Sequence, residues 1–323
     1  MNEKEIIETF LDMGVQLSSE ALSIIKKNPH LIEQIKKEET RPFIITGEHL
    51  KKIMNLENEA TIKTIKIFSL KSDKIRIEDY VTHLHSRYEK MKDLILKNNP
   101  EKVISINKIT ENTLKFTIIG IVRNKTQNSV TIEDMTGEIN VIFDGILKYK
   151  LSEIGEDDVI GLTCRKEKNR YIASKIIFPD IPLNREVAKS NKDIKIFVSS
   201  KIVKDEDDKT LINLEDVKEP EMKEYQNIKF LIIPKSFFQR INANVNSDFL
   251  QTILKKRHIY SCFIADMSFG EDQLVLEQIP DIIISDLSPR MCKNYKGTTI
   301  ISVPENERGF IVNLKTREVA DNF

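Results

Sequence analysis

The chain has 323 residues, of which 40% are hydrophobic and 31% are charged. This mixture can bury the cores of two or three domains and is not the composition of a disordered chain. The 50 Lys and Arg residues balance the 50 Asp and Glu residues, so the net charge is zero. A protein that grips duplex DNA alone usually carries a basic excess, so any nucleic-acid contact must come from a local patch or from a partner.

The sequence gives no sign of a membrane segment, a secretion signal or a zinc motif. No apolar run approaches the ~18 residues that a membrane helix needs, and the charged start at Met1–Glu5 lacks the core of a signal peptide. Cys164, Cys262 and Cys292 lie far apart and form no CxxC pair. We therefore expect a cytoplasmic protein that holds no metal or other cofactor.

Residues 1–58 are predicted to form a small helical domain. Ile6, Ile7, Phe10 and Leu11 recur at helical spacing, and Gly14 is a plausible stop. A second helix should start at residues 18–20 and continue after Pro29, and a third should follow residues 46–48. Nothing in this bundle suggests chemistry, so a docking module or a stabilising cap is expected.

Residues 59–98 are predicted to be a linker followed by a helix. Residues 59–75 carry no strong period, whereas from Ile77 an apolar stripe recurs at helical spacing. His83 and His85 are two residues apart and therefore point to different faces of this helix. We expect them to occupy surface or capping positions rather than to share a metal.

From residue 99 to residue 183 the pattern is that of short strands. A helix is expected within Ile146–Ile154, between the third and fourth strands, and a tight turn at Asp134–Gly137. This order matches an OB-fold β-barrel. The five expected strands are Lys115–Arg123, Ser129–Glu133, Glu138–Phe143, Val159–Arg165 and Tyr171–Phe178.

Residues 190–323 follow a polar linker and are predicted to form an α/β or stacked-sheet domain. Their short, continuous apolar runs are typical of strands buried on both faces, and Ser247–Arg257 is expected to be helical. The runs are Ile194–Ser199, Ile228–Ile233, Ile259–Met267, Gln273–Glu277, Asp281–Ser285, Thr298–Ser302 and Phe310–Leu314.

Two groups of basic residues in the barrel are candidates for nucleic-acid contact. Arg123 and Lys125 are at its first turn. Single-strand binders pair basic grooves with aromatic platforms, but aromatic residues are sparse here, so we favour solvated surface or partner contact over a direct grip on DNA. The second group, around the last hairpin, is Arg165, Lys166, Lys168, Arg170 and Tyr171.

Three stretches together resemble a known family over nearly the whole chain. They are the helix segment Arg87–Met91, the segment Phe178–Pro182, and the run Val275–Ile282, which continues through residues 295–297, 300–302 and 312–319. This arrangement resembles the small subunit of archaeal family-D DNA polymerase, which is related to the B-subunits of eukaryotic replicative polymerases. The resemblance implies an α+β multidomain fold with an N-terminal helical bundle, an OB-fold β-barrel and a C-terminal calcineurin-like phosphoesterase-type α/β domain, here truncated and degenerate.

In some members of that family the phosphoesterase domain is a 3′–5′ exonuclease with two divalent metals. Its ligands come from Asp-x-His, Gly-Asp-x-x-Asp, Gly-Asn-His and Gly-His-x-His motifs at strand ends. By this resemblance the first motif falls on Ser200 and Ile202, and the two histidines of the last on Leu287 and Pro289. Leu and Pro offer no lone pair to a metal, and Ser is a poor ligand. We therefore predict no catalytic residue and no metal site.

Five acidic residues of the C-terminal domain could in principle form a different metal site. Acidic residues in loops are more often solvated, and we expect that here. The five are Asp266, Glu271, Asp272, Asp281 and Asp286.

Three functions follow from the sequence. The first is a non-catalytic, structural small subunit of a replicative archaeal DNA polymerase complex, which scaffolds the large catalytic subunit and meets DNA through the complex. The second is a metal-dependent 3′–5′ exonuclease, against which the missing ligands argue. The third is a free-standing OB-fold protein that binds single-stranded DNA, against which the zero net charge and the large extra domain argue.

Overall fold

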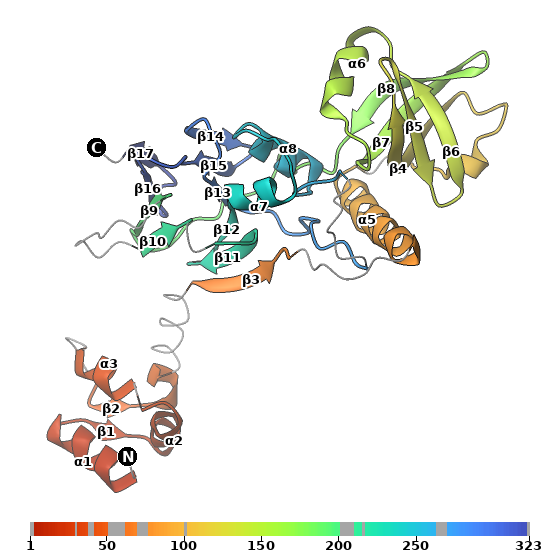
Figure 1. Ribbon diagram of the computed structural model, residues 1–323. Coiled ribbons are helices and arrows are strands. Elements are labelled where there is room, and N and C mark those ends of the chain that lie inside the picture. The colour runs from red at the N-terminus through yellow and green to blue at the C-terminus, as the bar shows by residue number, and fades with distance from the viewer. Residues whose placement is uncertain are drawn as a thin grey trace. The chain divides into compact units, whose positions relative to one another are not determined.

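The computed structural model describes residues 3–29, 31–37, 42–50, 62–69, 77–99, 102–200, 210–214, 217–262 and 270–321 (Figure 1). The chain divides into two compact units. The first consists of Met1–Lys63 with Tyr225–Asn227, and the second of Thr64–Glu224 with Ile228–Phe323. Among the described residues, no helix combines the length and the apolar character needed to cross a membrane.

The N-terminal unit contains short helices around one apolar core. Its elements are α1 (Glu3–Asp12), β1 (Gln16–Leu17), α2 (Ser19–Lys27), α3 (Leu31–Lys37) and β2 (Ile44–Ile45), with β1 and β2 paired in parallel. Ile6 and Phe10 are buried one turn apart on α1. Ser18 caps α2, because its hydroxyl accepts the Ala21 N–H at 3.1 Å.

The expected second helix is two helices, α2 and α3, which are separated at Asn28 and Pro29. Of the expected third helix, residues 47–50 are helical and the rest lies outside the described residues. The two-residue strands β1 and β2 were not expected, because so short a pairing leaves no period in the sequence.

The middle of the chain is a closed barrel with strand order β4-β5-β6-β8-β7. All neighbours are antiparallel except β6 and β8, which pair in parallel. Between β6 and β7 lie α6 (Gly145–Tyr149) and η2 (Lys150–Glu153), within the range expected to be helical. The strands are β4 (Lys115–Lys125), β5 (Ser129–Asp134), β6 (Gly137–Ile142), β7 (Val159–Glu167) and β8 (Arg170–Ile177).

The turn between β5 and β6 is held by the carboxylate of Asp134. This carboxylate accepts the backbone N–H groups of Thr136 and Gly137, the hydroxyl of Thr136, and the N–H of Ile106, at 2.6–3.1 Å. Ile106 begins η1 (Ile106–Lys108), so one side chain fixes both the turn and the segment that enters the barrel.

The long helix α5 (Ile77–Asn98) packs against the outside of the barrel (Figure 1). Its apolar stripe, Leu84, Tyr88, Met91 and Ile95, joins Ile119, Ile121, Val159 and Ile177 of the barrel in one buried cluster. His83 and His85 do point to different faces. However, His83 is buried, which contradicts the expected surface or capping role, whereas His85 is exposed.

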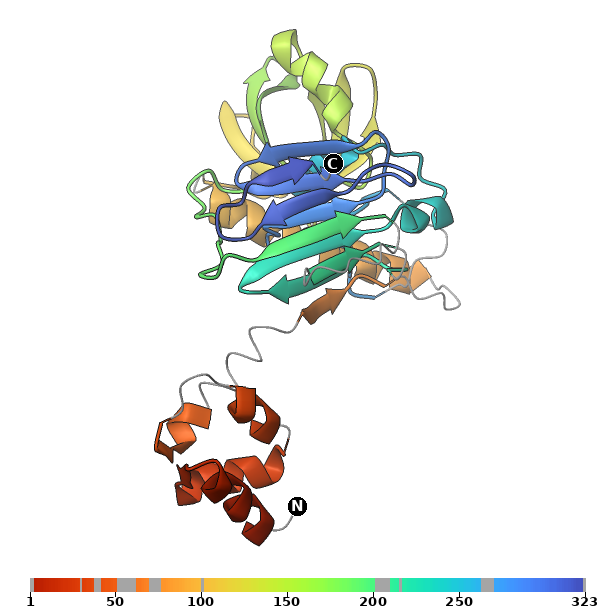
Figure 2. The same ribbon diagram turned by 90° about the vertical axis from the view of Figure 1, so that its left-hand side faces the viewer.

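The C-terminal part of the chain contains two sheets that lie against each other (Figures 1 and 2). One has the order β14-β15-β13-β12-β11-β3 and the other β10-β9-β16-β17. Helices α7 (Lys235–Arg240) and α8 (Phe249–Lys256) cover the other face of the larger sheet through Phe237, Phe238 and Leu254. The strands are β3 (Lys63–Ile67), β9 (Lys195–Ser199), β10 (Thr210–Asn213), β11 (Glu221–Tyr225), β12 (Ile228–Ile233), β13 (Ile282–Ser285), β14 (Met291–Tyr295), β15 (Thr298–Ser302), β16 (Phe310–Asn313) and β17 (Val319–Asp321).

Three expectations for this part were wrong. Gln273–Glu277 is not a strand, since only Val275 forms an isolated bridge, to His258. The apolar residues of this segment are buried because Leu274 and Leu276 pack in the cluster beneath α7 and α8 and Val275 packs between α5 and the barrel, not because they pair in a sheet. The expected strand Ile259–Met267 is irregular over residues 259–262, and its remaining residues lie outside the described part of the chain. Strand β3 lies in the range that was expected to be a linker.

Candidate functional site

The carboxyl ends of the parallel strands β12, β13 and β15 meet at one edge of the larger sheet. In register, Ile233 lies beside Ser285, and Ser285 lies beside Ser302. The Ser285 hydroxyl donates to the Ile233 carbonyl at 2.7 Å, and the Ser302 hydroxyl donates to the Leu287 carbonyl at 2.5 Å. Both serines are fully buried. The strand ends are therefore closed by hydroxyl-to-backbone hydrogen bonds.

Two of the four expected ligand positions, Ser200 and Leu287, are buried in the same kind of packing. Ser200, which follows β9, is buried and donates to the Pro304 carbonyl at 3.1 Å. Leu287 is buried in the apolar cluster beneath α7 and α8, and Pro289 is exposed. Ile202 lies outside the described residues. Across the described part of the chain, no three His, Cys, Asp or Glu residues are grouped so that they could hold a metal ion.

The two basic groups of the barrel are separated by the length of β4. Lys115, at the start of β4, pairs with Arg165, whereas Arg123 and Lys125 are near its end. At ~3.3 Å per residue, the eight positions from 115 to 123 span about 26 Å. One small surface patch cannot contain both groups.

Most of these basic side chains already have partners. Arg123 contacts Glu133 at 2.9 Å, and Lys125 donates to the Ile154 carbonyl at 2.6 Å. On the β7–β8 hairpin, Arg165 contacts Glu167 at 2.7 Å, and Lys166 donates to the Glu111 carbonyl at 3.1 Å. The hairpin still gathers Lys168 and Arg170 in exposed positions, and Tyr171 packs edge-on against Phe116 at 5.6 Å between ring centres.

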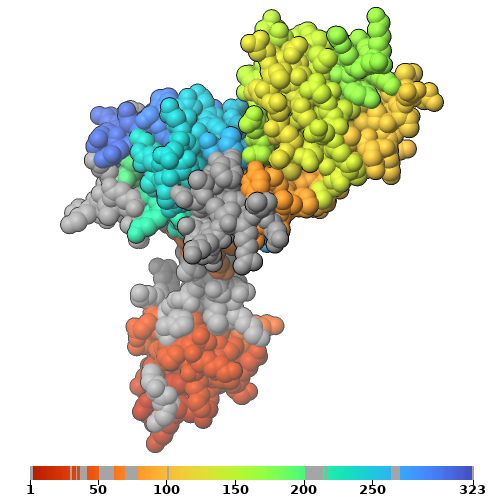
Figure 3. Space-filling model, turned by 45° about the vertical axis from the view of Figure 1, so that its right-hand side comes forward, coloured from red at the N-terminus to blue at the C-terminus, as the bar shows by residue number. Residues whose placement is uncertain are grey.

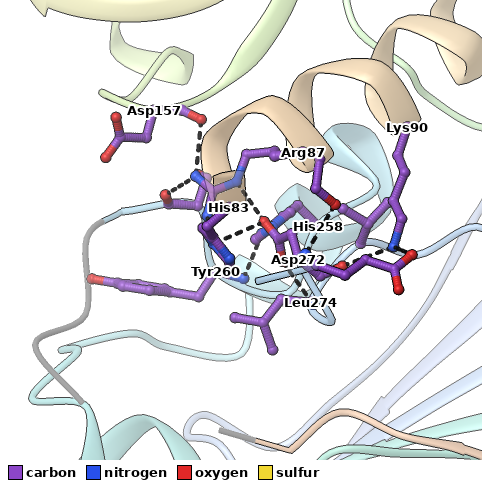
Figure 4. Close-up of polar contacts among 12 residues, drawn as sticks. His83, Arg87, Lys90, Asp157, His258, Tyr260, Asp272 and Leu274 are labelled. Carbon is purple, nitrogen blue, oxygen red and sulfur yellow. Dashed lines mark hydrogen bonds and ion pairs between the residues drawn. The ribbon is translucent and has the colours of Figure 1, made fainter. Parts of the chain in front are cut away.

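Sequence reasoning missed a buried polar cluster where α5, the barrel and the sheet domain meet (Figure 4). Its centre is Asp272, whose side chain is fully buried. One carboxylate oxygen, Oδ2, accepts from Arg87 Nε at 2.6 Å and lies 2.9 Å from His258 Nε2. The other, Oδ1, accepts the Leu274 N–H at 2.9 Å. The expectation that Asp272 is a solvated loop residue was therefore wrong.

Arg87 connects the three parts of the junction. Its Nη1 donates to the Asp157 carbonyl of the barrel at 3.2 Å and to the Ser261 carbonyl of the sheet domain at 2.5 Å. Its Nη2 lies 3.2 Å from His83 Nε2. The same nitrogen of His83 also lies 3.3 Å from Asp272 Oδ2.

The protonation states in the cluster follow from burial and from the central charge pair. Burial lowers the pKa of His83 to about 4 and also lowers the pKa of His258, so both rings are neutral at pH 7. Burial opposes ionisation of Asp272, but the hydrogen bond from His258 and the positive charge of Arg87 outweigh it and hold the pKa of this carboxyl well below its usual range. The cluster is thus one buried ion pair flanked by neutral imidazoles. It holds the barrel and the sheet domain together.

A second link runs beside the first. Asp158, in the loop before β7, accepts the Ser261 hydroxyl at 2.5 Å and pairs with Lys256 of α8 at 2.6 Å. Lys90 of α5 adds an ion pair to Glu271 at 2.8 Å and a hydrogen bond to the Asp272 carbonyl at 3.1 Å. Barrel, helix and sheet domain are therefore tied together by several charge-assisted contacts.

Of the other acidic residues, Asp281 also contradicts the expectation of solvation. It is buried, pairs with Arg185 and accepts the Lys229 N–H at 2.8 Å. Asp286 is half-buried and accepts the Lys235 N–H at 2.5 Å, and burial raises the pKa of this carboxyl. Glu271 is exposed, and Asp266 lies outside the described residues.

The fold and the cluster define a class of protein: a chain of mixed α and β structure in which a five-stranded barrel and two stacked sheets are joined through α5. No family model matches the chain. A curated protein of Archaeoglobus fulgidus, named DNA polymerase II small subunit, is 27% identical to it over 144 residues. That match covers 43% of this chain and 29% of the relative's length, so the chain spans less than a third of the relative. The similarity supports a relationship to small subunits of DNA polymerases.

Proposed function

We propose that this chain is a non-catalytic accessory subunit of a replicative archaeal DNA polymerase complex, where it scaffolds the large catalytic subunit. The observation that carries the proposal is the similarity to the protein named DNA polymerase II small subunit. In this role the chain works in DNA replication in the cytoplasm and meets DNA through the complex.

The domain assignment forms part of this proposal. The barrel order β4-β5-β6-β8-β7, with α6 between β6 and β7, supports an OB fold for residues 99–183. The stacked sheets support a truncated, degenerate phosphoesterase-like domain in residues 190–323. Residues 1–58 are assigned to the helical domain, and residues 59–98 to the linker and helix. The hairpin residues Lys168 and Arg170 remain candidates for contact with DNA in the complex.

The packing of the strand ends supports the non-catalytic part of the proposal. A two-metal hydrolase needs several carboxylate, imidazole or amide ligands held at fixed positions. Here Ser285 and Ser302 direct their hydroxyls to backbone carbonyls, and the Leu287 side chain packs in the core. A metal would have to break these contacts and would gain only weak ligands.

Co-expression with the large polymerase subunit of the same organism tests the proposal. We expect the two chains to elute together in size-exclusion chromatography and to remain together at moderate salt. Elution of this chain as a lone monomer would refute the scaffold role. The fastened junction suggests that the barrel and the sheet domain bind as one rigid surface, so a chain truncated after residue 183 should not bind.

A further inference from the structure

Strand β3 is the last strand of the larger sheet, beyond β11 (Figure 1). Among the described residues, no strand pairs with its other edge. The barrel lies on the other side of the sheet domain, away from this edge (Figures 2 and 3). An open edge presents unpaired backbone N–H and C=O groups and is a template for another strand.

The open edge of β3 is rich in exposed apolar side chains. Ile65 is 37% exposed and Ile67 is 53% exposed. Side chains alternate along a strand, so these two isoleucines share the face opposite Lys66. Edge strands are usually protected by lysines, but Lys66 is directed inward, and its Nζ donates to the Val275 carbonyl at 3.3 Å. The charge left at this edge is that of Lys63, where the strand begins.

The backbone groups that face the open edge belong to the odd-numbered residues. The Phe68 N–H donates to the Pro220 carbonyl at 2.8 Å, directly before β11, and therefore points toward that strand. The backbone groups of successive residues in a strand point to alternate edges. The groups at positions 63, 65 and 67 therefore point toward the open edge.

One register lets two copies of β3 satisfy these groups with each other. In an antiparallel pair centred on Ile65, this residue lies opposite its own counterpart, and Ile67 lies opposite Lys63 of the second copy. Such pairs exchange both N–H···O bonds, so every outward group of β3 gains a partner. No lysine opposes a lysine, because Lys66 falls opposite Thr64. A pair centred on Lys66 would oppose two lysines, and one centred on Thr64 would pair Ile67 with a residue outside the strand.

We propose that two copies of this chain associate through β3, as an antiparallel pair centred on Ile65 that joins their larger sheets into one. The Ile65 and Ile67 side chains of both copies then lie on one face of the joined sheet, where they cover one another. One short strand buries less area than a standard interface, so the dimer is weak and depends on concentration. The pairing is independent of the polymerase role, and its test uses this chain alone.

Sedimentation equilibrium of the full chain, at concentrations from roughly 1 to 500 µM, tests the proposal. We expect the average mass to rise from that of one chain toward that of two. Ile65→Pro removes an N–H that points to the open edge and keeps the hydrogen bonds to β11, so this variant should stay monomeric. Its far-UV circular dichroism should match that of the wild type.

A charge at residue 67 tests the register itself. Ile67→Glu puts a carboxylate opposite Lys63 of the second copy, whereas Ile67→Lys puts an ammonium there. General hydrophobic adhesion would weaken equally in both, because both lose the same side chain. In the proposed register the Glu variant should dimerise at least about fourfold more tightly than the Lys variant, since the cross-strand charge pair changes from repulsive to attractive at two symmetric positions. Adding Lys63→Glu to Ile67→Lys should restore the tighter dimer.

Leu114→Lys is the matched control, since Leu114 is an apolar side chain of the barrel that is 71% exposed. This variant should dimerise as the wild type does. The proposal is overturned if the wild type stays monomeric over the whole range, or if the Glu and Lys variants at residue 67 dimerise equally. It is also overturned if Leu114→Lys loses as much affinity as Ile67→Lys, or if a folded Ile65→Pro dimerises like the wild type.

Discussion

Replacing Arg87 with Met tests whether the buried cluster fastens the barrel to the sheet domain. Methionine keeps much of the apolar volume of the arginine stem but removes the guanidinium. The change deletes the contact to Asp272 Oδ2 and the hydrogen bonds to the carbonyls of Asp157 and Ser261. Asp272, whose side chain is fully buried, loses its cationic partner.

The expected cost is large because both partners are withdrawn from water. Removing one member of a buried ion pair typically costs about 3–5 kcal/mol. Asp272 retains His258 and the Leu274 N–H, so we expect about 3 kcal/mol. Arg165→Met is the matched control: its guanidinium contacts the carboxylates of Asp144 and Glu167, but its side chain is 44% exposed against 2% for Arg87. The control should cost much less, because ion pairs between solvent-exposed side chains contribute little to stability.

Urea unfolding followed by far-UV circular dichroism measures both costs, since the chain has no Trp to report by fluorescence. Hydrogen exchange of the α5 amides locates the effect and should speed up in Arg87→Met. Adding Asp272→Leu to Arg87→Met should recover part of the loss, because the unpaired charge is removed. If Arg87→Met lowers the free energy of unfolding no more than Arg165→Met does, the buried cluster does not hold the barrel and the sheet domain together.

Three further predictions concern acid, the barrel turn and metal. Lowering the pH from 7 to 4 should reduce the free energy of unfolding. The pKa of His83 is about 4 in the folded chain against 6.5 in the unfolded chain, so the unfolded chain binds more protons between pH 7 and pH 4. Unfolding measured over a series of pH values should show a weaker pH dependence for His83→Gln. Asp134→Ala should destabilise the barrel by about 2–4 kcal/mol in calorimetry, because four donors lose one charged acceptor; an unchanged melting temperature would contradict this. The purified chain should bind no stoichiometric manganese and should leave 3′-labelled single strands intact; co-eluting cleavage that disappears with Asp286→Asn would reveal a metal site built differently.

Local patterns in the sequence predicted the barrel and α5 well. The run at residues 115–123 became β4, and the stripe that begins at Ile77 became α5, because each carries a clear strand or helix period over many residues. Short or edge strands such as β3 and β17 were missed, since their residues are mostly exposed and leave no apolar alternation in the sequence, and the partner of β3 is distant in the chain.

The buried cluster could not be predicted from local patterns for the same reason. Asp272 looks like any loop carboxylate until Arg87 is brought against it. One signal was available: His83 and Arg87 are four residues apart and border the stripe that contains Leu84 and Tyr88, so one side of each had to approach the core. Nothing local, however, indicated their partner.

The separation of Arg87 and Asp272 along the chain has a consequence for the synthesis of the protein. Arg87 and Asp272 are 185 residues apart. At about 5–20 residues per second, a ribosome makes α5 roughly ten to forty seconds before Asp272. The barrel and α5 can assemble in that interval, but the Arg87 guanidinium stays exposed to solvent until Asp272 has been made. The buried ion pair can therefore form only after most of the chain has been made. A prematurely terminated chain that lacks Asp272 would leave the charge of Arg87 exposed, which distinguishes it from the complete fold.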